Sequence, residues 1–170
     1  MKKHTRTLAY TALLLALGLA LPRALHVFGQ NAGQMFLPLH LPVLVAGFAL
    51  GAVPGSVLGA VPPAASFALS GMPPPPMLWF MTAELLVYGL SAGLFRKKLR
   101  LPLWASLPLA QVSGRTAYAL VLLVLGGVFH LNVPPATMVL TALVTGLPGI
   151  AAQWLLVPLL VKTLEKARKT

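Results

Sequence analysis

Long runs of apolar residues, broken by short basic clusters and by Pro or Gly, dominate this chain of 170 residues. A helix that crosses a membrane needs about 20 apolar residues, and the pattern predicts six such spans. Their approximate bounds are 7–21, 39–53, 55–70, 77–95, 103–130 and 136–161. We therefore predict an all-α integral membrane bundle of six transmembrane helices, which forms a single domain over residues 1–170.

The second and third predicted spans are short, and only the turn at 52–55 separates them, so one long broken span is the alternative. The basic residues decide between the two counts, because cytoplasmic loops carry an excess of Lys and Arg. With six spans and a cytoplasmic N-terminus, all three basic clusters fall on the cytoplasmic side, whereas with five spans the clusters are divided between the two sides of the membrane. The clusters hold 11 of the 13 basic residues: Lys2, Lys3 and Arg6; Arg96, Lys97, Lys98 and Arg100; Lys162, Lys166, Arg168 and Lys169. We predict a multi-pass protein of the bacterial cytoplasmic membrane with both termini in the cytoplasm.

Composition supports a membrane protein and argues against nucleic-acid binding, metal binding and catalysis. The chain is 58% hydrophobic and 9% charged, against about 25% charged residues in a typical soluble domain. The net charge of +11 is explained by topology rather than by nucleic-acid binding. The sequence has no Cys, no metal-ligand spacing among its four His, no phosphate-binding loop and no Ser/His/Asp arrangement. We predict no metal, no cofactor and no catalytic residue, and therefore no enzyme.

One carboxylate stands out. Glu84 is one of only two acidic residues, and it lies within the apolar fourth span. A carboxylate at membrane depth is costly and marks a partner, a cavity or a ligand. Arg115 is the basic residue that can meet it at similar depth. Helical spacing places Glu84 and Tyr88 on one face, and Gln111, Arg115 and Tyr118 on another. These faces predict either a structural ion pair or a ligand site, and the two roles are compatible.

Two further polar residues are candidates for ligand contact. His40 lies at the expected outer start of the second span, as an interfacial histidine or a ligand contact. Gln153 follows the kinking sequence at 146–149, and an interhelical hydrogen bond and a ligand contact both remain open. The aromatic residues available to line a pocket are Trp79, Phe80, Tyr88, Tyr118 and Trp154. The polar loop at 22–38 is long enough to be functional.

Small residues recur along the first span. Ala12, Ala16 and Ala20 are spaced by four residues, which forms a flat stripe that another helix can approach closely. The alternative is packing inside the bundle.

Several segments, taken in order, resemble a known family. They are LPLHLPVLVAG at 37–47, LGAVPGSVLGAVPPAASFALSGMPP at 50–74, ELLVYG at 84–89, GRTAY at 114–118 and GLPGIAAQWLLVP at 146–158. Together they resemble the substrate-binding S component of energy-coupling factor (ECF) vitamin transporters.

The resemblance implies six helices, a vitamin pocket near the outer face, and loops after spans one, three and five that close it. It also implies partners, namely a membrane T component and two cytoplasmic ATPases. In the family an Ala-x-x-x-Ala stripe docks on the T component, and Ala12, Ala16 and Ala20 match it. Arg115 can pair with a carboxylate ligand, or Glu84 can neutralise it and leave a neutral site. Pantothenate is the first candidate, with cobalamin, folate and haem as others.

Three other functions compete with vitamin capture. A purely structural assembly subunit would leave the polar face of Gln111, Arg115 and Tyr118 unexplained. A solitary proton-coupled secondary carrier would use Glu84 and predicts a repeat between the two halves of the chain, of which we find no convincing sign. An intramembrane enzyme would need a histidine at the depth of Glu84, whereas His40 and His130 are expected near the outer face.

Overall fold

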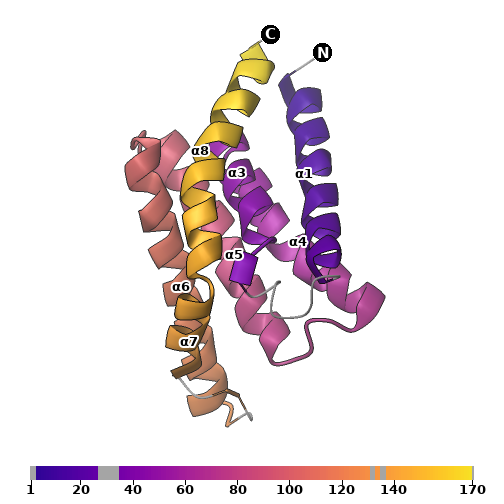
Figure 1. Ribbon diagram of the computed structural model, residues 1–170, viewed down its shortest axis with the longest axis vertical. Coiled ribbons are helices and arrows are strands. Elements are labelled where there is room, and N and C mark those ends of the chain that lie inside the picture. The colour runs from indigo at the N-terminus through magenta and orange to yellow at the C-terminus, as the bar shows by residue number, and fades with distance from the viewer. Residues whose placement is uncertain (1–2, 27–34, 131–132, 135–136, 170) are drawn as a thin grey trace.

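The computed structural model describes residues 3–26, 35–130, 133–134 and 137–169. Within these residues the chain is helical and has no strand (Figure 1). The helices are α1 (Lys3–His26), α3 (His40–Leu50), α4 (Ala52–Ser70), α5 (Met77–Gly93), α6 (Leu103–Gly127), α7 (Thr137–Thr145) and α8 (Leu147–Lys169), and the π-helical turn η1 (Leu94–Lys98) extends α5. Part of the long loop predicted at 22–38, residues 27–34, lies outside the described residues.

The all-α membrane bundle is confirmed, but the count of six full spans is not. Among the described residues, five helices are long and apolar enough to cross a membrane, namely α1, α4, α5, α6 and α8. Helix α3 has 11 residues, which at 1.5 Å per residue is about 16 Å, roughly half of a hydrocarbon core of about 30 Å. The predicted sixth span is divided at Gly146 into α7 and α8.

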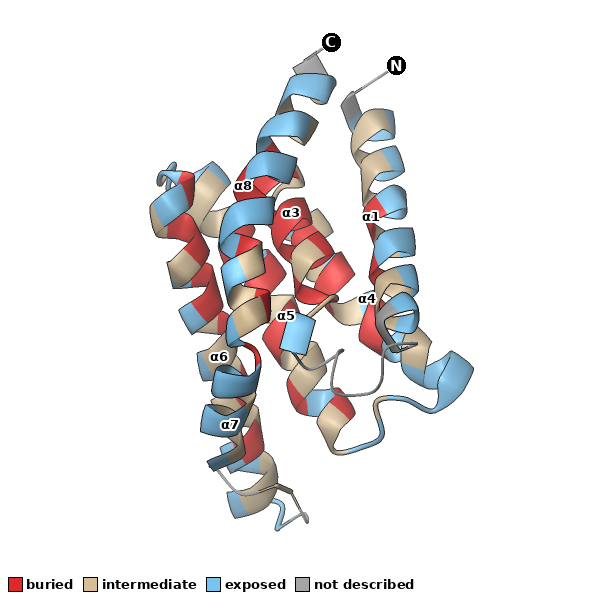
Figure 2. Cartoon of the chain, in the orientation of Figure 1, coloured by how far each residue is buried: buried red, intermediate tan, exposed pale blue. Residues whose placement is uncertain are grey.

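The short helix α3 is the centre of the bundle. Its residues from Pro42 to Ala49 are buried on every side, and α1, α4, α5 and α8 surround it (Figure 2). A helix that is apolar all round is expected to be buried in this way. Gly51 then turns the chain directly into α4. The shortness of α3 therefore reflects its place in the core, where it is enclosed by protein rather than by lipid.

Glycines let helices α3, α4 and α5 pack so closely that their backbones are in contact. A methyl group added to Gly59 would collide with the carbonyl group of Leu85, and one added to Gly89 would collide with the carbonyl group of Gly55. We call this contact the glycine seam, and its members are Gly47, Gly55, Gly59, Gly89 and Gly93. Small residues at helix contacts give close packing where lipid supplies no hydrophobic drive.

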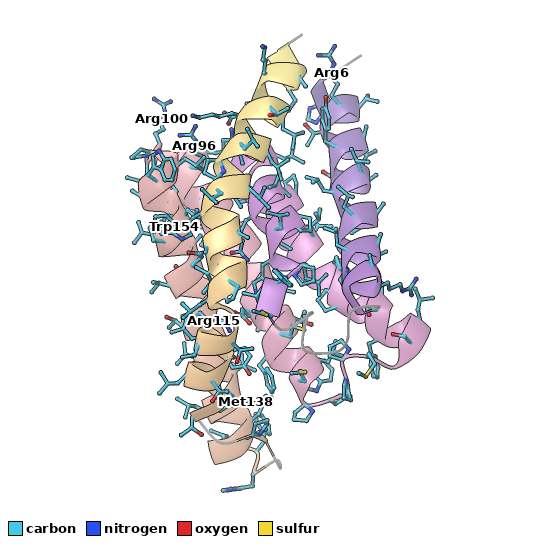
Figure 3. The ribbon with its side chains drawn as sticks, viewed as in Figure 1. Arg6, Arg96, Arg100, Arg115, Met138 and Trp154 are labelled. Carbon is cyan, nitrogen blue, oxygen red and sulfur yellow. The ribbon has the colours of Figure 1, made fainter. Side chains whose placement is uncertain are left out.

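The basic clusters gather at the end of the bundle that holds both termini. Lys97 Nζ lies 2.7 Å from Glu165 Oε1, which joins η1 to the end of α8. Arg6 donates a hydrogen bond of 3.3 Å to the Arg168 carbonyl oxygen. Figure 3 shows Arg6, Arg96 and Arg100 at this basic end. Described residues of all three clusters therefore lie at the same end of the bundle, and the α4–α5 connection lies toward the opposite end (Figure 1).

Candidate ligand-binding site

The two charged residues predicted to meet inside the bundle do so. Glu84 on α5 and Arg115 on α6 approach to 3.1 Å between Oε1 and Nη1, and their side chains are 4% and 14% exposed. The guanidinium also lies 5.9 Å from the ring centroid of Tyr118. Arg115 is therefore held between a carboxylate and an aromatic face, both of which attract a cation.

His40 lies deeper than the sequence predicted. Helix α3 begins near the middle of the bundle rather than at its outer face (Figure 1), so the imidazole is 3% exposed. Its Nε2 atom lies 3.6 Å from Glu84 Oε1. The expectation of an interfacial histidine is wrong, because the chain before α3 enters the bundle before the helix starts. Depth therefore no longer argues against a joint role for His40 and Glu84.

Tyr88 connects the ion pair to α3. Its ring meets His40 edge-on, with centroids 5.0 Å apart. The ring lies directly against Gly114 of α6, where an added methyl group would come within 2.5 Å of Tyr88 Cδ2. Gly114 thus makes room for the phenol, one residue before Arg115. Tyr118 packs edge-on against Phe80 at 4.8 Å, which places both predicted tyrosines around the charged pair.

Unpaired polar atoms concentrate in this region. Buried polar groups in proteins nearly always have a hydrogen-bond partner. In the part of the chain that the structure describes, six buried side-chain nitrogen and oxygen atoms have none, and they belong to only four residues. These atoms are His40 Nδ1 and Nε2, Glu84 Oε1, Arg115 Nε and Nη2, and Gln153 Nε2. Glu84 Oε1 is close enough to Arg115 for charge attraction, but the pair lacks hydrogen-bond alignment.

A chain of amide hydrogen bonds lies one helical turn from Arg115. Trp154 Nε1 donates to Gln111 Oε1 at 3.0 Å, and Gln111 Nε2 donates to Gln153 Oε1 at 2.9 Å. The interhelical hydrogen bond considered for Gln153 is therefore present, and it joins α8 to α6. We call the region formed by His40, Glu84, Arg115, Gln111 and Gln153 the polar seam.

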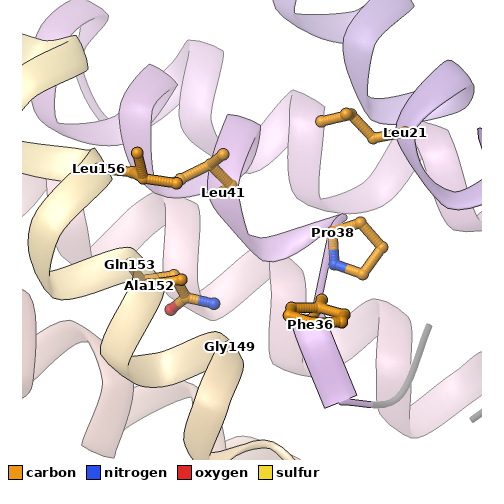
Figure 4. Close-up of a pocket in the computed structure, with 8 residues that line it drawn as sticks. All are labelled: Leu21, Phe36, Pro38, Leu41, Gly149, Ala152, Gln153 and Leu156. Carbon is orange, nitrogen blue, oxygen red and sulfur yellow. The ribbon is translucent and has the colours of Figure 1, made fainter. Parts of the chain in front are cut away.

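A small cavity opens beside Gln153. Its volume is about 210 Å³, below the roughly 300–1,000 Å³ of pockets that enclose a drug-sized ligand. The only polar side chain in its lining is that of Gln153, whereas the Glu84–Arg115 pair does not line it. The lining residues are Leu21, Phe36, Pro38, Leu41, Gly149, Ala152, Gln153 and Leu156 (Figure 4).

Gly149 positions one wall of this cavity. A methyl group at Gly149 would lie 2.7 Å from the Met35 carbonyl oxygen and 2.8 Å from Phe36. The segment 35–38 therefore rests directly on the start of α8. In the sequence, the 146–149 motif indicated only a kink, and the contact with a segment more than 100 residues earlier was not visible.

The remaining predicted residues lie apart from the polar seam. Trp79 is 55% exposed on the outside of α5. Ala12, Ala16 and Ala20 all lie on the exposed side of α1, which packs on the bundle through Leu14 and Gly18 instead. The alanine stripe therefore takes no part in packing inside this bundle.

Comparison with known proteins gives one family. A family profile described as "ECF transporter, substrate-specific component" matches residues 6–161, which is most of the chain. Neither the curated proteins nor the solved structures gave a match. The matched range contains the polar seam, the cavity, the glycine seam and the exposed alanine stripe. On this match the chain belongs to the family of ECF transporter substrate-specific components.

Proposed function

We propose that this protein captures a compact water-soluble vitamin or related micronutrient and delivers it to an ATP-driven import complex. It acts without catalysis, from the bacterial cytoplasmic membrane, with the basic end in the cytoplasm. The family supports capture in general. The observation that carries the proposal is the set of buried side-chain atoms on His40, Glu84, Arg115 and Gln153 that have no hydrogen bond.

The unpaired atoms supply a physical reason for ligand binding. Each buried polar group without a hydrogen bond costs free energy. A ligand that satisfies several of them regains that cost, and an analogue that lacks the matching groups does not. The polar seam thus supplies specificity, while the apolar cavity and the rings of Tyr88 and Tyr118 supply contact area.

The size of the cavity bears on the substrate. A volume of about 210 Å³ fits a compact vitamin better than cobalamin or haem. Pantothenate stays our first candidate, because its carboxylate complements the charge of the Arg115 guanidinium while its amide carbonyl offers a hydrogen-bond acceptor. Folate would fit with only part of its length enclosed.

The capture subunit needs partners, because it carries no nucleotide-binding loop of its own. We propose docking on a membrane T component, which two cytoplasmic ATPases drive. The exposed stripe of Ala12, Ala16 and Ala20 is the proposed docking surface. Its small side chains leave the backbone of α1 open to a close approach by another helix.

A thermal-stability screen tests the capture function. The purified protein in detergent is heated with each water-soluble vitamin and with haem, and the midpoint temperature is recorded. A ligand that binds only the folded state raises the midpoint by an amount that grows with concentration. We expect one compact vitamin to do so. Stabilisation by none of them, in a protein that unfolds cooperatively, would contradict the proposal.

Orientation has an equally direct test, because the chain contains no cysteine. Single cysteines in place of Ser70, beyond which the α4–α5 connection begins, and Lys98, at the basic end, each provide a unique thiol. On intact cells a membrane-impermeant maleimide should label the first and spare the second. The reverse pattern would contradict the proposed topology.

One observation favours a second function. His40 Nε2 lies 3.6 Å from Glu84 Oε1, and a buried carboxylate beside a histidine is the kind of intramembrane site that a proton-coupled secondary carrier uses. Proteoliposomes that contain this protein alone separate the two functions. Accumulation of substrate driven by a proton gradient, without ATPases, would favour the carrier. ATP-dependent uptake that needs the T component favours capture.

A further inference from the structure

The amide chain beside the cavity fixes which atom Gln153 offers to a ligand. An indole N–H can only donate a hydrogen bond, so the atom of Gln111 that meets Trp154 Nε1 is the amide oxygen. The nitrogen of Gln111 must then face Gln153, and the atom of Gln153 that receives its hydrogen bond is again the oxygen. The usual ambiguity between the two ends of an amide is thereby removed. Gln153 must present its NH₂ group, a donor, on its free side.

That donor has no partner and points into the cavity. Gln153 is 3% exposed, and its Nε2 atom is buried without a hydrogen bond. Figure 4 shows the nitrogen directed toward Phe36 and Pro38 on the opposite wall. Every other side chain in the lining is apolar. The cavity therefore combines one fixed donor with an otherwise apolar lining around a volume of about 210 Å³.

We propose that this cavity binds a compact, uncharged, largely apolar part of the substrate that carries one hydrogen-bond acceptor, which meets Gln153 Nε2. The acceptor is a carbonyl oxygen, an ether oxygen or an unprotonated ring nitrogen. A charged group is disfavoured here, because the lining offers a single dipole and no counter-charge. The inference rests on the proposed capture function and narrows its substrate class. Any charged group of the same substrate belongs at the Arg115 end of the polar seam.

Two small probes of matched shape test the inference without knowledge of the nutrient. Cyclohexanone carries a carbonyl oxygen where methylenecyclohexane carries a CH₂ group. Their dissociation constants are measured by ligand-observed NMR on the full chain in nanodiscs, with empty nanodiscs subtracted. The readout is the preference ratio, which is the dissociation constant of the hydrocarbon divided by that of the ketone. Because the ratio compares probes within one protein, general changes in stability cancel.

We expect Gln153→Met, which keeps the length of the side chain but removes the donor, to lower this ratio about tenfold. Ala152→Leu fills the cavity and leaves the amide chain intact, so it should abolish binding of both probes. Ala151→Leu changes an exposed neighbour on the same helix and should leave both constants unchanged. An equal ratio in wild type and Gln153→Met overturns the role of the donor. Absence of binding of either probe to wild type overturns the cavity as a ligand site.

A second measurement serves if Gln153→Met does not fold. In wild-type protein labelled with ¹⁵N-glutamine, cyclohexanone should shift a side-chain amide proton of Gln153 downfield, and methylenecyclohexane should not. An unmoved resonance under saturating ketone overturns the proposal. Neither probe is a nutrient, so failure of the vitamin screen leaves these readouts intact. Conversely, a failed probe test leaves capture standing, with the ligand at another part of the polar seam.

Discussion

The glycine seam and the polar seam meet on the same helix, α5, and they are built on opposite principles. On the side facing α4, the glycines bring two backbones together until not even a methyl group fits. On the side facing α6 and the start of α3, Glu84 and Tyr88 are enclosed with His40 and Arg115, and this group holds five of the six buried side-chain atoms that lack a hydrogen bond in the described residues. The side facing α4 is packed at backbone contact, whereas the other side holds buried polar atoms without hydrogen bonds. In the proposed function, the closely packed glycine seam is the scaffold that positions the polar seam for a ligand.

The largest expected effect comes from breaking the polar seam. Glu84→Ala leaves Arg115 buried without its carboxylate, and removal of one partner of a buried ion pair costs about 3–5 kcal/mol. We expect the thermal midpoint in detergent to fall sharply and ligand binding to be lost. Glu165→Ala is the matched control at the basic end, where the pairs with Arg96 and Lys97 are about one-third exposed and worth about 0–1 kcal/mol. Equal midpoints for the two variants would contradict the contrast between the carboxylates.

Breaking the glycine seam should come next. In Gly89→Val the added side chain collides with the Gly55 carbonyl group, and overpacking of this kind costs about 3 kcal/mol. We expect a lower midpoint by circular dichroism. Gly127→Ala, where an added methyl group meets nothing within 4 Å, should match wild type. A Gly89→Val protein as stable as wild type would mean that α4 and α5 are not in backbone contact.

A smaller effect is expected from a variant that changes the cavity wall but leaves the glycine seam intact. In Gly149→Ala the methyl group would displace the segment at Met35 and Phe36, which moves a cavity wall without touching the glycine seam. We expect about tenfold weaker ligand binding, or roughly 1.4 kcal/mol, with the midpoint of the free protein nearly unchanged. Isothermal titration with the stabilising vitamin measures it. Unchanged affinity would show that this wall does not contact the ligand.

The smallest effect on fold and binding is expected outside both seams. Ala16 is exposed on α1, so Ala16→Trp should leave stability and vitamin affinity within error of wild type. Uptake by cells that contain the T component and ATPases should nevertheless be abolished, because the bulky ring blocks close helix approach. Leu155→Trp, on a residue of α8 that is 76% exposed, is the control and should transport normally. Loss of binding in Ala16→Trp would argue against a docking role.

The sequence predicts most of the helices and the ion pair, because long apolar runs and rare buried charges can both be recognised without knowledge of the fold. Apolar runs fix where helices lie, and Glu84 and Arg115 are rare charges in apolar segments that can best stabilise each other. The length of α3 and the depth of His40 could not be predicted in this way. They depend on how the chain before α3 enters the bundle and rests on Gly149, which is a contact between distant segments.

The amide chain illustrates the same limit. Gln111 and Gln153 were separate candidates in the sequence, and nothing in their spacing shows that the two meet across α6 and α8. The role of Trp154 as the donor that orients both amides follows only from three-dimensional placement. Likewise Gly114 reads as an ordinary small residue until the ring of Tyr88 is seen against it.

The central claim is that the nutrient binds in the cavity beside Gln153, and the most direct test compares ligand stabilisation in proteins with an intact and a filled cavity. The vitamin that stabilises wild type is titrated against wild type, Ala152→Leu and Ala151→Leu, and the midpoint temperature is followed in each. The account predicts a concentration-dependent rise in wild type and Ala151→Leu and none in Ala152→Leu. An equal rise in all three proteins would show that the nutrient binds elsewhere and would contradict the account.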